Sequence, residues 1–212
     1  MQLERVELPD SLWLQYQFRD YRNPKARIQR LHERGMLIRL KRGVYLSDWA
    51  KRDPYRLGRA ANRLYGPSYV SFEYALRWHG LIPEHVEEMT SATFRKNRSK
   101  RFDTNAGRFS YYDIPPQAYP RSVVFEPRGG NASHAGSWFL LAAPEKALCD
   151  QLYRISGVRS QSAIEQLLFD DLRIDPAVYA TLEQGLLARL CRLYRTETLS
   201  AFARYVERRY CA

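Results

Sequence analysis

Between residues 22 and 42 the chain gathers side chains that can bind phosphate groups and the edges of nucleic-acid bases. Arginine and lysine neutralise phosphates, arginine can also hold guanine through two hydrogen bonds, and glutamine can do the same with adenine. The residues in question are Arg22, Asn23, Lys25, Arg27, Gln29, Arg30, Arg34, Arg39, Lys41 and Arg42. This chemistry predicts a surface for a polyanion, provided that the fold presents these side chains together.

A second basic cluster lies between two segments with the pattern of strands. Among its charged side chains only Asp103 is acidic; the basic ones are Arg95, Lys96, Arg98, Lys100 and Arg101. Two interpretations stay open. The cluster is either the solvated, mobile loop of a β-hairpin or a second surface that faces DNA or an acidic partner.

A short helix is predicted to carry the first half of the 22–42 cluster. Asn23 can cap free backbone N–H groups, Pro24 suits the first helical position, and Gly35 suits the end of the helix. At about 100° per residue, Ile28 and Leu31 fall on one side of this helix. The opposite side carries Ala26, Gln29, Arg30 and Glu33. We therefore expect Gln29 and Arg30 to point outward.

The residues that follow alternate as they would in a β-hairpin. Ile38 and Leu40 face one way. The other face carries Leu37, Arg39 and Lys41. Arg42-Gly43 fits a two-residue turn, because glycine readily adopts the positive φ that such turns need. The second half of the cluster is thus predicted to lie on a basic hairpin.

Another helix is predicted ahead of this pair. Asp10 or Ser11 can cap it, and Leu12, Tyr16 and Arg19 recur at helical spacing. The order of two helices and a basic hairpin is that of a winged helix-turn-helix. In that arrangement the second helix enters the major groove of DNA and the hairpin lies along the backbone.

The charge balance also favours a polyanionic partner. The 212-residue chain has a formal net charge of +11, and residues 1–52 hold twelve lysines and arginines against six acids. A surplus of this size indicates a polyanion as partner or, less often, an anionic membrane surface or an acidic protein. Together with the winged-helix pattern it favours binding to double-stranded DNA. The sequence has no run of about 18 apolar residues and no secretory signal at its start, so we expect a cytoplasmic protein with no membrane partner.

No metal, cofactor or catalytic residue is predicted. The four histidines lack metal-binding spacing, and Cys149, Cys191 and Cys211 are expected to be free thiols in a reducing compartment. One enzymatic alternative is a metal-dependent nuclease. It would use Asp113, Glu126 and Lys146, although the Glu-x-Lys spacing of such sites is missing.

The remaining chain predicts a second unit that begins near residue 53. Its expected elements are a helix from Asp53-Pro54 to Gly66-Pro67, a short helix between Ser71 and Gly80, strands at 86–94 and 107–114, a buried strand that enters a helix at Pro144, and helices over 160–210. The predicted fold class is α+β. A winged helix-turn-helix domain at 1–52 precedes a mixed α/β domain at 53–212, which has a helical C-terminal end.

Three segments carry a recognisable family pattern. "NPKARIQRLHERGMLIRLKRGVYL" carries it at Arg30-Leu31, Arg34-Gly35, Ile38, Arg39, Arg42-Gly43 and Tyr45. "YVSFEYALRWHGLIPE" carries it at Ser71, Ala75, Leu76, His79, Gly80 and Leu81, and departs from it at Tyr74, where the family has serine. "APEKALCDQLY" carries it at Pro144, Glu145, Lys146, Ala147, Leu148, Asp150, Leu152 and Tyr153. Together the segments resemble the AbiEi family of antitoxins and transcriptional regulators, which belong to type IV toxin–antitoxin systems.

The resemblance implies a two-domain repressor and antitoxin that serves in phage defence. Such a protein binds repeated sites in its own promoter and acts there as a monomer or weak dimer, with cooperativity on DNA. Its C-terminal domain, residues 53–212 here, counteracts a nucleotidyltransferase-like toxin without a stable complex. A stand-alone regulator without antitoxin activity is the other alternative.

Overall fold

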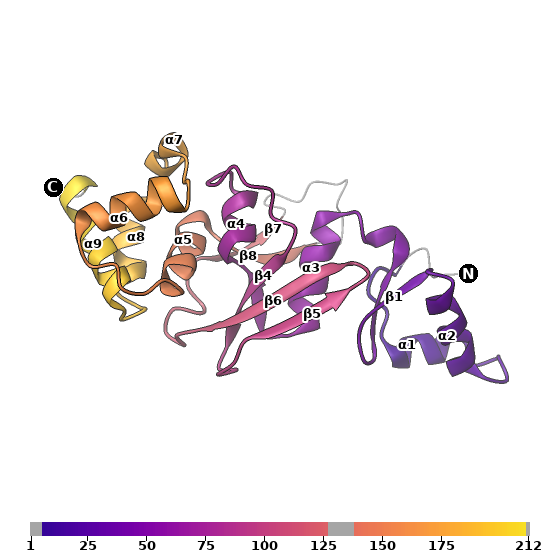
Figure 1. The fold of residues 1–212 in the computed structure, drawn as a ribbon. Coiled ribbons are helices and arrows are strands. Elements are labelled where there is room, and N and C mark those ends of the chain that lie inside the picture. The colour runs from indigo at the N-terminus through magenta and orange to yellow at the C-terminus, as the bar shows by residue number, and fades with distance from the viewer. Residues whose placement is uncertain (1–5, 127–137, 211–212) are drawn as a thin grey trace.

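The computed structural model describes residues 6–126 and 138–210. The molecule is elongated, with the N-terminal helices and hairpin at one end, a β-sheet in the middle and a group of helices at the other end (Figure 1). The α+β class predicted from the sequence is confirmed. Within the described ranges, no helix is both long enough and apolar enough to cross a membrane.

The helices are α1 (Ser11–Gln17), α2 (Pro24–Glu33), α3 (Pro54–Leu64), α4 (Phe72–Trp78), α5 (Pro144–Tyr153), α6 (Gln161–Gln166), α7 (Pro176–Ala180), α8 (Gln184–Cys191) and α9 (Glu197–Tyr210). Shorter turns are the 3-10 helix η2 (Asp48–Ala50) and the π-helix η4 (Leu167–Asp171). The strands are β1 (Leu37–Lys41), β2 (Val44–Ser47), β3 (Ser68–Val70), β4 (Met89–Phe94), β5 (Lys100–Thr104), β6 (Gly107–Ile114), β7 (Val123–Glu126) and β8 (Phe139–Ala142).

Helices α1 and α2 begin where the sequence predicts. The Asp10 carboxylate accepts the Trp13 backbone N–H at 2.8 Å, and the Asn23 side-chain oxygen accepts that of Ala26 at 3.0 Å. Gly35 has a φ of +72°, which suits it to the turn after α2. Capping therefore fixes the start of both helices.

A small apolar cluster packs α1 against α2. It consists of Leu14, Phe18, Ile28, Leu31 and Leu37, with Trp13 and Tyr45 partly buried at its edge. Ile28 and Leu31 were predicted on one side of α2, and both are buried. In α1, by contrast, the residues singled out for their helical spacing lie on the solvent side. Leu12 and Tyr16 are 80% and 63% exposed. Two stripes of this short helix have helical spacing, and the one that contains Leu14 and Phe18 covers α2.

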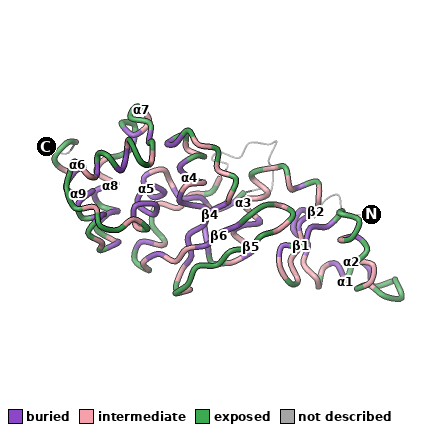
Figure 2. The backbone as a smooth tube through the Cα atoms, viewed as in Figure 1, coloured by how far each residue is buried: buried purple, intermediate pink, exposed green. Residues whose placement is uncertain are grey.

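Both faces of the β1–β2 hairpin are in contact with the rest of the protein. In Figure 2 much of the hairpin is accordingly coloured as buried or intermediate. Leu37 joins the cluster beneath α1 and α2. Ile38, Leu40 and Leu46, which face the other way, join the main core of the molecule. Residues 6–10 run beside β2, where the Ser47 backbone N–H donates to the Glu7 carbonyl oxygen at 2.9 Å. The predicted change of unit near residue 52 coincides with the start of α3, yet the core continues across it.

The central sheet has the strand order β5-β6-β4-β3-β8-β7. The β4–β6 and β3–β8 pairs are parallel, and the other pairs are antiparallel. On one face, Tyr69 of β3 donates a hydrogen bond to Asp150 of α5 at 3.0 Å. On the other face, Phe139 packs against Gly58 of α3, where an added Cβ would lie 2.6 Å from the ring. Helix α3 therefore covers one face, and α5 covers the other.

Several elements of the second unit differ from the prediction. The first strand begins at Met89, and the short strands β3 and β7 were not predicted. The connector between the two predicted strands contains β5, which pairs with β6 from Lys100↔Tyr111 to Thr104↔Gly107. Its polar sequence hides this strand, because the pairing with β6 and not the local pattern stabilises it. The helical end over 160–210 follows the prediction, with short breaks between its helices.

Candidate nucleic-acid interface

Six of the predicted DNA-contacting lysines and arginines are exposed. Within the described part of the chain none of them pairs with a carboxylate; they are Arg22, Lys25, Arg30, Arg34, Arg39 and Arg42. They lie around α2 and on the adjoining hairpin, and are thus supplied by the N-terminal end of the molecule (Figure 1). Six cations without internal partners leave this end positively charged.

The start of α2 borders a groove of about 370 Å³. Its lining residues are Tyr21, Arg22, Asn23, Ala26, Arg27 and Arg30. The Arg27 guanidinium lies 5.4 Å from the centre of the Tyr21 ring, and its buried Nε has no hydrogen-bond partner. The N-terminus of a helix also favours anions, because its free N–H groups and the helix dipole are positive there. The groove has the charge and the donors to hold a phosphate.

Two polar residues of the cluster already have partners within α2. The Gln29 side-chain amide donates to Glu33 at 3.0 Å, and the side-chain oxygen of Asn23 caps the helix. Gln29 is exposed as predicted, but a base contact would require it to give up Glu33. Arg30 has no such competing bond and is the better candidate for a base edge on this face.

Lys41 is directed away from the outer surface of the hairpin. Its ammonium donates to the backbone carbonyl oxygen of Leu64, at the end of α3, at 2.6 Å, and its side chain is partly buried. Lys41 was predicted to contact DNA from the hairpin together with Arg42, and this bond competes with such a contact. Arg42 is exposed in the turn, whereas Lys41 ties the hairpin to α3.

The connector cations contact aromatic rings. The Lys96 ammonium lies 5.1 Å from the centre of the Tyr65 ring, Arg98 donates to the Tyr65 hydroxyl at 3.3 Å, and Lys100 lies 5.5 Å from the centre of the Phe102 ring. Arg101 pairs with Asp103 at 3.2 Å. Lysine and arginine on aromatic faces keep their charge available to an outside anion.

The turn at the start of the connector is fixed by Asp113. One of its carboxylate oxygens accepts the Lys96 N–H and the other accepts the Asn97 N–H, each at 3.0 Å. Arg95, which is exposed, lies over the Phe94 ring at 5.1 Å. Together with β5, these bonds give the connector regular structure, while its contact with DNA or an acidic partner stays a prediction. Strands β1 and β5 are also in contact, so the connector lies beside the basic hairpin.

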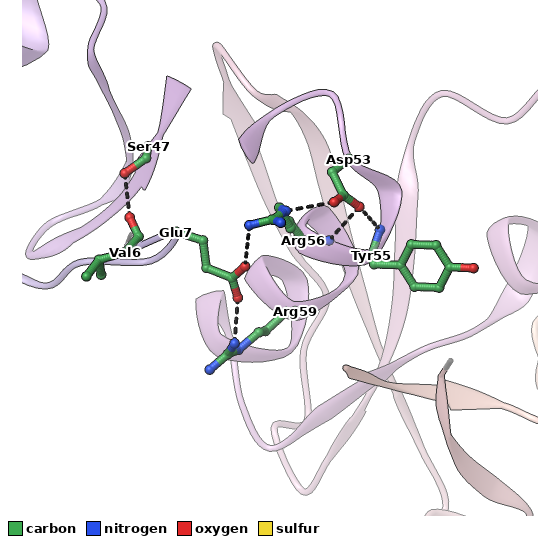
Figure 3. Close-up of polar contacts among 7 residues, drawn as sticks. All are labelled: Val6, Glu7, Ser47, Asp53, Tyr55, Arg56 and Arg59. Carbon is green, nitrogen blue, oxygen red and sulfur yellow. Dashed lines mark hydrogen bonds and ion pairs between the residues drawn. The ribbon is translucent and has the colours of Figure 1, made fainter. Parts of the chain in front are cut away.

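A set of ion pairs fixes the N-terminal end to α3, and sequence reasoning missed it (Figure 3). Glu7, which is almost fully buried, accepts from Arg56 at 3.2 Å and from Arg59 at 2.6 Å. Asp10 pairs with Arg63 at 3.0 Å. The signal was present in the spacing, because arginines at i, i+3 and i+7 lie on one side of a helix.

Asp53 completes this junction. Its carboxylate accepts Arg56 Nε at 2.7 Å and the Tyr55 backbone N–H at 2.9 Å, as Figure 3 shows. Burial raises the pKa of Asp53, but the hydrogen bonds from Arg56 and Tyr55 outweigh it, and the pKa lies below its usual value. The charges of Glu7, Asp53 and the α3 arginines are thus largely satisfied within the protein.

The segment "APEKALCDQLY" forms α5, and its charged residues lie in the core. Lys146 and Asp150 are completely buried and form an ion pair at 2.5 Å. Asp150 also accepts from Tyr194 at 2.6 Å and from Ser71 at 2.6 Å. Burial, reinforced by the charge of Asp150, raises the pKa of the Tyr69 and Tyr194 hydroxyls well above the usual value. The network is closed to solvent and holds α5 to the sheet and to α8–α9.

The residues of the nuclease alternative do not form a site. Asp113 lies on β6 and Glu126 on β7, and three strands separate them in the sheet. At about 4.8 Å per strand the two carboxylates are about 19 Å apart, too far to bind one metal ion. The Lys146 ammonium forms its ion pair with Asp150 inside the core. Within residues 6–126 and 138–210, no group of three or more metal-ligating side chains occurs.

The comparisons with known proteins give a fold neighbour and no family. The structure is similar to the crystal structure of the Rv2827c protein from Mycobacterium tuberculosis, with a TM-score of 0.59 and 15% sequence identity. The match covers 97% of this chain and 73% of that chain. No protein-family model matches the sequence, and no curated protein matches it. At this identity the likeness concerns the fold alone.

Proposed function

We propose that this protein is a DNA-binding transcriptional regulator whose N-terminal end is a winged helix-turn-helix. Helix α2 enters the major groove of double-stranded DNA and the β1–β2 hairpin lies along the backbone. The observation that carries the proposal is the set of exposed, unpaired arginines around α2, two of which, Arg22 and Arg30, line the groove at its start. Side chains without internal partners are available to phosphates and to guanine.

The connector extends the proposed DNA surface. Lys96 and Lys100 lie over aromatic rings and Arg98 donates to the Tyr65 hydroxyl, and the charges of all three can contact the phosphates next to those bound by Arg42. Contacts of this kind position a protein on the duplex without reading its sequence. Neutralising about 4–6 phosphates per chain corresponds to a log–log salt slope of roughly −4 to −5.

The second half of the proposal is antitoxin activity in residues 53–212. It rests on the three segments that resemble the AbiEi family, which implies repression of the protein's own operon and action against a nucleotidyltransferase-like toxin. The third segment forms α5, most of whose residues are buried. Its resemblance to the family therefore concerns the packing of the core and not a surface that contacts a partner. A contact surface for the toxin is not part of the proposal, in keeping with an antitoxin that forms no stable complex.

Arg22→Ala with Arg30→Ala tests the DNA-binding half. Affinity for the DNA upstream of the protein's own gene should fall about tenfold or more at physiological salt. Arg22 is proposed to contact a phosphate and Arg30 a base edge, so the salt slope should become shallower by about 0.9. Arg77→Ala with Arg195→Ala is the matched control, because both side chains are exposed and unpaired in the described structure and lie outside the proposed surface. Equal losses in the two variants would contradict a localised surface.

The same variant tests the division of labour. In cells that express the toxin of the same operon, Arg22→Ala with Arg30→Ala should abolish repression of a promoter reporter and still protect growth. Loss of protection at a normal protein level would contradict the assignment of antitoxin activity to residues 53–212. A wild-type protein that represses but never protects would identify it as a stand-alone regulator.

A further inference from the structure

Two buried thiols face one another across the interface between α5 and α8. Cys149 lies in α5, Cys191 is the last residue of α8, and both are free cysteines with almost no exposed surface. Their sulfur atoms are 3.8 Å apart. The two residues are 42 positions apart in the sequence, so a bond between them would join distant parts of the chain.

The pair can form a disulfide after a small movement. A disulfide needs a sulfur–sulfur distance of about 2.05 Å, so the two sulfurs must approach by less than about 2 Å in total. Helices α5 and α8 already pack together, and rotation of both side chains can share this approach. A pair of thiols brought this close differs from a lone buried cysteine, because each has a partner for oxidation.

We propose that Cys149 and Cys191 are a redox modification site, at which a low-molecular-weight disulfide such as oxidised glutathione converts the two thiols into a cross-link between α5 and α8. One cysteine, as its thiolate, attacks a sulfur of oxidised glutathione, forms a mixed disulfide and releases one reduced glutathione. The second cysteine attacks the protein sulfur of that intermediate and releases the other. The two thiols lose two protons and two electrons, and these reduce one oxidised glutathione to two glutathione thiols.

Burial controls when the reaction occurs. It raises the pKa of the Cys149 thiol well above its usual value, and the neighbouring Cys191 thiol adds to the effect. The thiolate that attacks a disulfide is therefore scarce in the closed protein, and the reaction proceeds when α8 opens or while the chain folds. Once formed, the cross-link closes a long loop and stabilises the helical end.

The site goes beyond the proposed function and is independent of it. Helices α5 and α8 lie toward the opposite end of the molecule from α2 (Figure 1). The cross-link should therefore change the stability of the C-terminal half and leave DNA affinity unchanged.

The experiment uses the full chain with Cys211→Ala, which leaves only the two thiols of the pair. The protein is refolded from denaturant in oxidised or in reduced glutathione, so burial cannot block the reaction. After refolding in oxidised glutathione, free thiols should fall from two to none, the mass should drop by about 2 Da, and the melting temperature should rise by about 5 °C or more. Dithiothreitol should reverse all three changes.

Cys191→Ser in the same background is the matched control, since its remaining thiol can form only a glutathione adduct. Two free thiols after oxidative refolding, cross-links only between chains, or a lower melting temperature in the oxidised form would each overturn the proposal. A melting temperature that rises equally in Cys191→Ser would also overturn it.

Discussion

The arginines of α2 and those of α3 have different environments in one protein. Around α2, Arg22 and Arg30 are exposed and have no carboxylate partner in the described structure. On α3, Arg56 and Arg59 share the buried carboxylate of Glu7, and Arg63 pairs with Asp10. The two helices have similar lengths and both are rich in arginine, so composition alone does not separate them.

The difference shows how the same side chain serves two purposes. On α3, arginine joins parts of the chain, because buried or half-buried guanidinium groups form strong bonds to carboxylates. On α2, the chain supplies no acid to most of the arginines, and their charge remains available to an outside anion. The feature that separates the helices is the placement of acids at positions 7 and 10, next to α3 and away from α2.

The largest loss of stability is expected when a completely buried ion pair is broken. Asp150→Ala leaves the buried Lys146 ammonium without its carboxylate, and the free energy of unfolding should fall by about 3–5 kcal/mol. Urea denaturation measures this loss. Glu183→Ala, which breaks the exposed pair with Arg189, is the control and should cost less than about 1 kcal/mol. Similar losses in both variants would mean that burial does not set the strength of these pairs.

A smaller effect is expected at the junction with α3. Glu7→Gln should lower the free energy of unfolding by about 1.5–3 kcal/mol, because it weakens two charge-assisted hydrogen bonds. It also removes the negative charge that faces Arg56 and Arg59, although Arg56 keeps its bond to Asp53. Binding to unrelated DNA should therefore become tighter while stability falls, as shown by fluorescence anisotropy beside a melting curve. Unchanged DNA binding would show that pairing with Glu7 does not hide these charges.

The smallest effect on stability is expected at the connector. Replacing Arg95, Arg98 and Lys100 with glutamine should change the free energy of unfolding by no more than about 0.5 kcal/mol per site, since all three side chains are exposed. Affinity for unrelated DNA should fall, and its salt slope should become shallower. If DNA affinity and protection from the toxin both survive, the connector is only a basic turn of the sheet.

Local signals in the sequence predicted the elements around the proposed DNA surface well. Asn23, Pro24 and Gly35 act through the backbone beside them, so the limits of α2 could be deduced from these residues. The alternation of Ile38 and Leu40 with Leu37 also predicted the two faces of the hairpin correctly. What these faces touch could not be deduced, because contact partners depend on packing between distant segments.

The features that were missed depend on partners outside the local pattern. Lys41 bonds to Leu64 and Glu7 to Arg59, both far along the chain, and β5 is stabilised by its neighbour β6 although its own sequence is polar. The spacing of the α3 arginines was visible, but it does not say which acid pairs with them. In α1 the periodicity was present but ambiguous, and only packing against α2 decides between its two apolar stripes.

The hairpin that lies between two apolar clusters also limits how this protein can evolve. Residues 6–52 do not form an independent module that can be moved between proteins, because Ile38, Leu40 and Leu46 pack into the core next to α3. If this segment were moved into another protein, the apolar face of its hairpin would be exposed there, and the original protein would lose part of its core. Under the proposed DNA-binding function, a change of target sequence is therefore more easily made by changing the outward residues of α2 one at a time, with the hairpin kept as it is.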